Sequence, residues 1–174
     1  NTIILVRLSL ELSEIAFSIT MLLFGAGCIF AAIIIPHLSK EMTASRIMLA
    51  GSNLLSIIFV ALAFWLILFD FIWFVLLLAW FISGFGYTLL LTPMGRVIRM
   101  VSSVDEFSQV YSAQFSLSHL CWLFMYPLSG YLMTTSGGPF TLLTLAMLMV
   151  CSNIIAAWHF SCLLYTSPSP RDLY

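Results

Sequence analysis

The chain has 174 residues, of which 62% are hydrophobic and only 7% are charged, and its formal net charge is -1. Because a soluble domain carries about 25% charged residues, this composition excludes a soluble globular protein and predicts an integral membrane protein. The chain also lacks a basic run, which argues against nucleic acid and against an anionic lipid surface as partners.

The four cysteines, Cys28, Cys121, Cys151 and Cys162, fall in or at the end of apolar stretches, and none forms a C-x-x-C pair. We interpret them as small buried hydrophobic side chains, and we predict no metal site and no cofactor. The chain begins at Asn1 and shows no signal peptide, so we expect a fragment of a longer protein.

Five apolar stretches without Asp, Glu, Lys or Arg follow one another along the chain. A helix needs about 20 residues to cross the hydrocarbon core of a bilayer. The stretches therefore predict five transmembrane spans, at residues 15–35, 47–68, 71–93, 110–134 and 140–164. Before them, residues 1–6 are interpreted as the end of a preceding helix and residues 7–14 as a surface loop. The predicted fold is an all-α membrane bundle, with residues 1–164 as one transmembrane domain.

Hydrophilic or helix-breaking segments separate the spans. Residues 36–46 and 94–109 carry charged side chains, Asp70 marks a tight break, and residues 135–139 form an uncharged turn rich in Gly and Pro. In the first span, Gly25 and Gly27 are small enough to let another helix approach closely, and we favour such a packing role over a functional one.

Lysine and arginine accumulate in cytoplasmic loops. Lys40, Arg46, Arg96 and Arg99 all lie in the first and third breaks, whereas the second and fourth breaks contain neither residue type. We therefore predict that the first and third breaks and the C-terminus face the cytoplasm, although Arg7 weakly opposes this orientation. Arg96 and Arg99 are expected to anchor the third span at the cytoplasmic interface.

The last ten residues, 165–174, change composition sharply. The string from Leu163 to Asp172 resembles the translated adapter read-through that ends some assembled transcripts, and the alternative is a disordered cytosolic tail. Neither interpretation gives this tail a function.

The fourth span, residues 110–134, is the most polar of the five. Ser112, Ser116 and His119 follow i, i+4, i+7 spacing and share one helix face, and Gln114, Ser118 and Trp122 form the neighbouring face. Polar groups are costly in lipid, so they normally face other helices or a water-filled cavity. His119 also falls near the centre of the span.

Two interpretations of this polar sector stay open. In the first, Gln114, Ser116, Ser118, His119 and Trp122 line a central cavity, with His119 as a proton carrier or a hydrogen-bonding group for a solute. In the second, the serines bond back to their own helix, His119 bonds one neighbouring helix and Trp122 packs.

Further along the same span, Pro127 and Gly130 predict a kink, which serves either as a hinge or as a bent packing element, and we favour packing. An intramembrane serine protease is not supported, since about 15 Å along the helix separates His119 from Ser129. We therefore predict that the protein is not an enzyme.

These features resemble the C-terminal half of a major facilitator superfamily transporter, from the end of its seventh helix through its twelfth. The resemblance is carried by residues 91–99 and 112–122, by residues 126–130, and by the Gly25–Gly27 segment, which are similar to a bacterial-type subgroup. The family's loop motif, Gly-x-x-x-Asp-Arg-x-Gly-Arg, has no Gly or Asp in the corresponding segment, Pro36–Arg46.

The resemblance implies two six-helix halves that rock about a site at the membrane midplane. The expected function is transport of a small solute or ion by alternating access, secondary active and coupled to protons. The expected partners are the solute, protons, the lipid bilayer and a missing N-terminal half. The alternative is a non-transporting helical scaffold or assembly subunit, whose polar sector only holds helices together.

Overall fold

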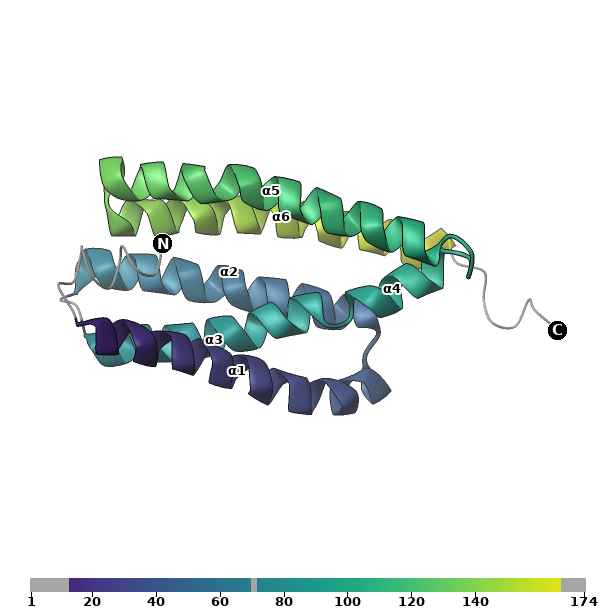
Figure 1. Ribbon diagram of the computed structural model, residues 1–174, viewed down its shortest axis with the longest axis horizontal. Coiled ribbons are helices and arrows are strands. Elements are labelled where there is room, and N and C mark those ends of the chain that lie inside the picture. Colours follow the sequence, from purple (N-terminus) through teal and green to yellow (C-terminus); the bar gives the residue numbers. More distant parts are fainter. Residues whose placement is uncertain (1–12, 70–71, 167–174) are drawn as a thin grey trace.

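The computed structural model describes residues 13–69 and 72–166, and helices account for nearly all of them (Figure 1). The helices are α1 (Glu14–Glu41), α2 (Ala44–Leu68), α3 (Trp73–Leu91), α4 (Met94–Val101), α5 (Phe107–Ser136) and α6 (Gly138–Thr166). The predicted all-helical fold is confirmed. The segment expected to end a preceding helix, residues 1–6, lies outside the described residues, as does nearly all of the tail.

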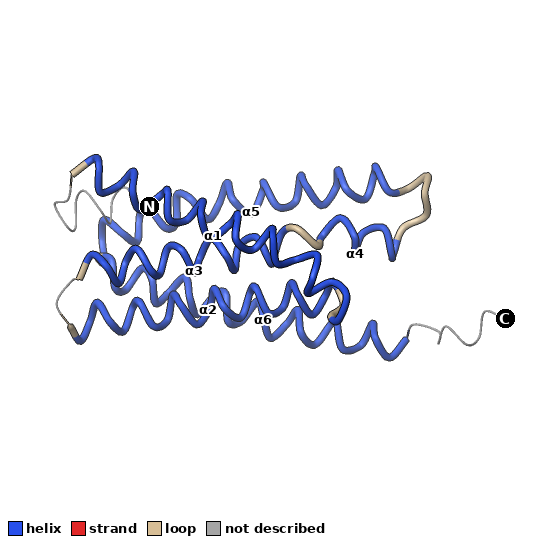
Figure 2. Tube along the Cα trace, turned by 90° about the horizontal axis from the view of Figure 1, so that it is seen from below, coloured by secondary structure: helices blue, strands red, loops and turns tan. Residues whose placement is uncertain are grey.

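The long helices lie side by side along one axis (Figures 1 and 2). α1 packs mainly on α3, α2 packs on both α3 and α6, and α5 makes most of its contacts with α6. α2 therefore joins two layers, one formed by α1 and α3 and the other by α5 and α6. The main apolar core is formed mostly by α1, α2 and α3, around Leu62, Leu76 and Trp80, and it also includes Met133 of α5 and Leu142 of α6.

Glycines bring the first three helices into close contact. A Cβ atom at Gly27 of α1 would clash with the backbone carbonyl of Phe81 in α3, and a Cβ atom at Gly84 would clash with that of Phe24. Gly51 of α2 meets α3 in the same way, with the Gly86 carbonyl oxygen 2.6 Å from a Cβ atom built at Gly51. Membrane helices use small residues for such approaches, so the predicted packing role is seen at Gly27. A Cβ atom at Gly25 would meet nothing within 4 Å.

The predicted spans at residues 15–35, 47–68, 110–134 and 140–164 each lie within one long helix, and α3 accounts for most of the span at 71–93. The segments between spans are far more helical than the sequence suggested. α1 continues through Pro36 to Glu41, and Lys40 lies in its last turn, where a positive charge is favourable. The segment 94–109 contains α4 and the first turn of α5. α4 forms because its residues are amphipathic, with Ile98 buried and both arginines exposed. In the segment 135–139, only Gly137, with φ of 80°, lies outside a helix.

Four stretches of the described helices are long and apolar enough to cross a membrane: Glu14–Glu41, Ala44–Leu68, Trp73–Val101 and Gly138–His159. The third runs through Pro93 from α3 into α4. α5 has 30 residues and is long enough to span, but it is less apolar than the other long helices. A fifth span at α5 stays a prediction.

Candidate solute-binding cavity

Two pockets lie along one side of α5. One, of about 480 Å³, lies between α5 and the junction of α3 with α4, and its lining residues are Leu91, Thr92, Met94, Gly95, Tyr111, Gln114, Phe115, Ser118, His119 and Trp122. The other, of about 430 Å³, lies among α1, α3, α5 and α6 and is lined by Phe24, Tyr87, Trp122, Met125, Tyr126, Ser129 and Leu145. Trp122 belongs to both pockets, so we refer to them together as the α5 cavity.

Four of the five residues expected to line a cavity are brought together there. Gln114, Ser118, His119 and Trp122 all line the larger pocket, whereas Ser116 does not and is exposed. The structure thus divides the predicted polar sector differently, because His119 of the first face joins the three residues of the second face and Ser116 does not. The side of α5 that carries Gln114, Ser118 and Trp122 looks toward α3 and α4, and Ser116 points away from the pocket.

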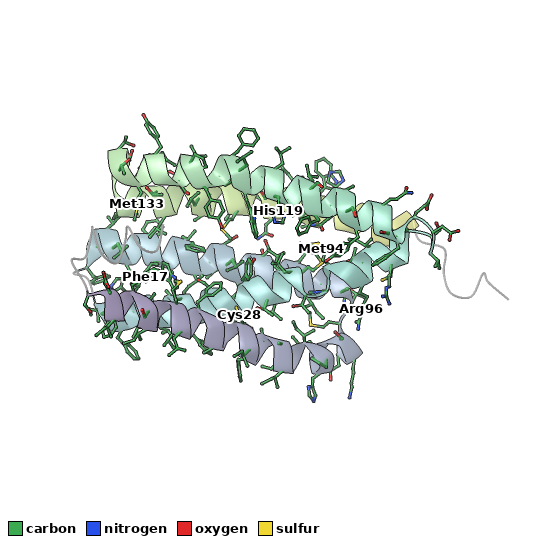
Figure 3. The ribbon with its side chains drawn as sticks, viewed as in Figure 1. Phe17, Cys28, Met94, Arg96, His119 and Met133 are labelled. Carbon is green, nitrogen blue, oxygen red and sulfur yellow. The ribbon has the colours of Figure 1, made fainter. Side chains whose placement is uncertain are left out.

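The hydrogen bonds of this sector stay within α5. The Ser118 hydroxyl donates to the Phe115 carbonyl oxygen at 2.8 Å, and His119 Nδ1 lies 2.8 Å from the same oxygen. A bond from His119 to a neighbouring helix, expected if the polar sector only packs, is not seen among the described residues, and a local bond takes its place. Because a carbonyl oxygen only accepts, Nδ1 carries the hydrogen, and the lone pair of the neutral ring lies on Nε2. Figure 3 shows His119 on the side of α5 that faces α3 and α4.

Aromatic rings form a ladder along the cavity side of α5. The ring of His119 lies 3.9 Å from that of Phe115 and 5.1 Å from that of Trp122, measured between centroids. Trp122 in turn meets Tyr126 edge-on at 6.2 Å. The i+4 and i+3 steps put these rings on one helix face. We call Phe115, His119, Trp122 and Tyr126 the aromatic ladder.

The two residues expected to kink α5 do not interrupt it. Pro127 lies inside the helix, which continues to Ser136, and a Cβ atom at Gly130 would meet nothing within 4 Å. Ser129 is buried in the smaller pocket, where its hydroxyl donates to the Tyr126 carbonyl oxygen at 3.0 Å. Its bond to the backbone gives Ser129 a structural partner rather than a catalytic one.

Arg96 and Arg99 both lie on α4, at the end of the bundle where α1 ends and α2 begins (Figure 3). The Arg99 guanidinium lies 5.3 Å from the centre of the Phe107 ring, a cation–π distance. Next to it, the Glu106 carboxylate accepts a hydrogen bond from the Ser103 hydroxyl at 2.7 Å and a longer one from its backbone N–H. These bonds hold the pKa of the Glu106 carboxyl below its ordinary value and fix the turn that leads into α5.

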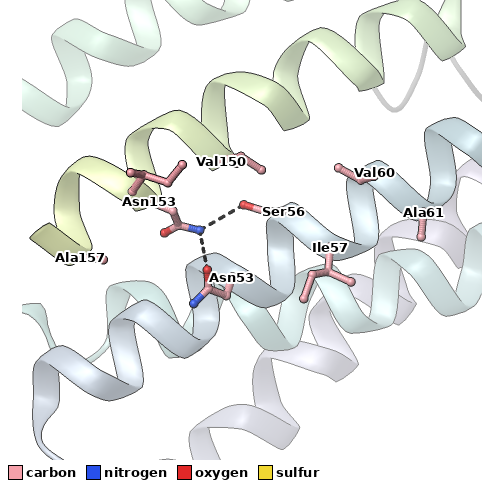
Figure 4. A pocket seen from close by; sticks show the side chains of 9 residues that line it. Asn53, Ser56, Ile57, Val60, Ala61, Val150, Asn153 and Ala157 are labelled. Carbon is pink, nitrogen blue, oxygen red and sulfur yellow. Dashed lines mark hydrogen bonds between the residues drawn. The ribbon is translucent and has the colours of Figure 1, made fainter.

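A second polar cluster, which the sequence analysis did not single out, joins α2 to α6 (Figure 4). The Asn153 side-chain amide donates to the Asn53 side-chain oxygen and to the Ser56 hydroxyl, each at 3.2 Å. Asn153 and Ser56 are buried, and the cluster borders an otherwise apolar pocket between the two helices. The sequence signal for this cluster was one asparagine within each of two apolar spans.

Within residues 13–69 and 72–166, no three His, Cys, Asp or Glu side chains gather in a way that could hold a metal.

The Major Facilitator Superfamily model matches residues 1–172 of the chain. Comparisons with curated proteins and with solved structures gave no match. The family match covers nearly the whole chain and agrees with the all-helical fold and its four apolar helices of membrane-spanning length. The chain is an integral, multi-pass membrane protein that belongs to the Major Facilitator Superfamily, a family of membrane transporters.

Proposed function

We propose that the chain forms one half of a secondary active transporter that moves a small solute by alternating access through the α5 cavity. The observation that carries this proposal is the cavity's position, since His119 lies near the middle of the 30-residue α5 and lines the pocket with Gln114 and Trp122. Ionisable groups at the middle of a membrane helix commonly mark solute or proton pathways. The pocket volume of about 480 Å³ lies in the range of small-molecule sites.

The pattern of hydrogen bonds favours a cavity over a scaffold. In the interpretation without a cavity, the serines bond to their own helix, as Ser118 does, and His119 bonds a neighbouring helix. His119 instead bonds to the Phe115 carbonyl of its own helix, and a cross-helix side-chain bond is made elsewhere, by Asn153. Both side chains line the pocket, and the polar atoms that do not bond to the backbone are available to a solute there.

α5 also exposes much of its surface. Large side chains on several sides of the helix are accessible, including Leu117, Phe124 and Tyr131. In the family architecture, two six-helix halves enclose the site. We propose that an N-terminal half covers part of α5 and supplies the other wall of the cavity, and that α5 is the fifth membrane span of this half.

His119 is the proposed proton carrier. Its Nε2 lone pair takes a proton from the cavity while the cavity is open to one side of the membrane, and the resulting imidazolium releases that proton when the cavity opens to the other side. The Phe115 and Trp122 rings flank the imidazole.

The membrane orientation predicted from the charged loops also fits the arrangement of the helices. The ends of the helices that carry Lys40, Arg46, Arg96 and Arg99 lie at one end of the bundle, with the C-terminal end of α6 (Figure 1). The positive-inside rule then supports a cytoplasmic position for this end. We propose that the larger pocket, beside α4, lies on the cytoplasmic side of the smaller one.

Transport by the full-length protein in proteoliposomes, screened over solutes with and without a pH gradient, tests the proposal. We expect solute movement that a pH gradient stimulates, and loss of that stimulation in His119→Ala. His159→Ala is the matched control, because His159 lies on α6 and lines neither pocket of the α5 cavity. Unchanged transport and pH dependence in His119→Ala would remove His119 from the mechanism, and a full-length protein that moves no solute would overturn the proposal.

A further inference from the structure

The lining of the α5 cavity also indicates what kind of molecule it recognises. Among the lining residues in the part of the chain that the structure describes, none is Asp, Glu, Lys or Arg. A solute with a full charge would lose its hydration there without gaining an ion pair, which is costly in a low-dielectric site. The absence of charge in this lining therefore favours an uncharged solute.

The aromatic ladder supplies flat surfaces at regular intervals. Its rings are not core residues, since Trp122 and Tyr126 are 41% and 65% exposed. Tyr87 of α3 and Phe24 of α1 bring two further rings to the opposite wall of the smaller pocket, 5.8 Å apart. A planar ring that enters between these walls can stack on one side and meet ring edges on the other, the two arrangements that aromatic pairs prefer.

Polar groups of the larger pocket add hydrogen bonds at the edge of such a ring. Gln114 and Tyr111 line it with an amide and a phenol, and His119 presents Nε2. Gln114 and Tyr111 have N–H or O–H donors, and His119 gains a second donor when protonated. A solute that carries a hydrogen-bond acceptor on its ring system would satisfy them.

We propose that the α5 cavity binds an uncharged, planar heteroaromatic solute that carries a hydrogen-bond acceptor, stacked on the aromatic ladder at Trp122. This inference rests on the proposed transport function and names its class of substrate. This solute class differs from a saturated, lipid-like occupant, which would gain from apolar burial but not from flat rings.

Binding of radiolabelled coumarin to the full-length protein in nanodiscs, with empty nanodiscs subtracted, tests the proposal. Coumarin is planar and uncharged and carries a carbonyl acceptor. Unlabelled octahydrocoumarin keeps the carbonyl but is saturated and puckered, and we expect it to compete at least about tenfold more weakly because it loses the ring contacts. Coumarin-3-carboxylate and N-methylquinolinium supply a planar anion and a planar cation, and both should compete poorly.

Variants of Trp122 separate stacking from burial. Trp122→Leu should weaken coumarin binding about three- to tenfold, the range of a lost aromatic pair, whereas Trp122→Phe should keep it within about twofold. Trp158→Leu is the matched control, because Trp158 of α6 is 74% exposed and lies outside the cavity lining. Circular dichroism and gel filtration of each variant exclude misfolding, and Trp122→Phe tests the proposal even where Trp122→Leu does not fold.

Equal binding by the Trp122→Leu and Trp158→Leu variants would overturn the proposal, as would equal competition by octahydrocoumarin or by either charged analogue. Absence of coumarin binding in a protein that transports another solute would overturn the substrate class and leave the proposed function intact. Coumarin binding that depends on Trp122, in a full-length protein that moves no solute, would support the recognition site and contradict the transport function.

Discussion

The first three helices and α5 differ both in composition and in how they pack. α1, α2 and α3 pack backbone against backbone through glycines, and their apolar side chains supply most of the core. α5 is less apolar, makes more contacts with α6 than with any other helix, and leaves most of its side chains exposed. The difference indicates that α1 to α3 form a closely packed scaffold, and that α5 leaves most of its surface for contacts outside this bundle.

The local bonding of the two regions shows the same contrast. Buried hydroxyls in the scaffold, such as Thr20 and Ser83, bond to their own backbone and are then covered by other helices. In α5, Ser118 and His119 bond in the same way but face a pocket. Because the Ser118 hydroxyl and Nδ1 of His119 are already bonded to the Phe115 carbonyl oxygen, Nε2 of His119 keeps a lone pair that is available to a proton or a solute.

The largest effect on stability is expected where helix backbones touch. Gly27→Ala places a methyl group against the Phe81 carbonyl, so α1 and α3 must separate, at a cost of about 1–3 kcal/mol or more. Gly25→Ala is the matched control on the same helix, and it should leave stability unchanged or slightly higher, because its Cβ atom meets nothing. Unfolding in detergent mixtures, followed by circular dichroism, measures both variants. Equal losses in the two variants would contradict the close approach of α1 and α3.

A smaller effect is expected at the joint between α2 and α6. Asn153→Leu removes both cross-helix hydrogen bonds, and such bonds in membranes are worth about 1 kcal/mol. Ser152→Ala is the control, because the Ser152 hydroxyl donates only to the Leu148 carbonyl of its own helix. The same unfolding measurement applies, and an Asn153→Leu variant as stable as Ser152→Ala would show that the cluster does not hold α6 in place.

The smallest effect is expected in the exposed turn before α5. The folded-state pKa of the Glu106 carboxyl is lowered by its bonds from Ser103. Its contribution to stability is therefore present above the unfolded pKa and is lost as the pH falls through the folded pKa. Glu106→Gln should differ in stability from the unchanged chain at neutral pH and converge with it as the pH falls below the folded-state pKa of Glu106. A difference that grows as the pH falls would have the wrong sign.

The sequence predicted where the helices lie along the chain, but not which helices pack against one another. Long uncharged stretches located every membrane-length helix, because 20 apolar residues in a row have few other stable forms. Pro36 suggested a break that the structure does not show, since a proline removes only one backbone bond and the surrounding helix can continue. Pro93 does mark a break, because α3 ends at Leu91 and α4 begins at Met94. Where a helix ends also depends on the contacts of its last turn with other helices, which the local sequence does not reveal.

The candidate site could be predicted only in part, because the sequence does not show which helices lie next to α5. Spacing alone grouped Ser116 with His119 on one face and Gln114 with Trp122 on the next, but which side faces a pocket depends on where α3 and α4 pass. Likewise, nothing local distinguishes Gly27, which α3 contacts, from Gly25, which it does not. The pairing of Asn53 with Asn153 joins residues 100 positions apart and required the fold.

The central claim, that the polar side of α5 lines a water-filled cavity while its other sides face lipid or protein, is tested most directly by cysteine accessibility in native membranes. In a background with the four native cysteines replaced, Ser118→Cys introduces a thiol in the pocket and Leu117→Cys introduces one on the adjacent side, where Leu117 is 62% exposed and lines no pocket of the α5 cavity. A membrane-impermeant methanethiosulfonate reacts with the thiolate, which forms only where water reaches the sulfur. Denatured samples of both variants confirm that each thiol is competent. We predict rapid modification of Ser118→Cys and protection of Leu117→Cys; the reverse order, or protection of both, would contradict the cavity.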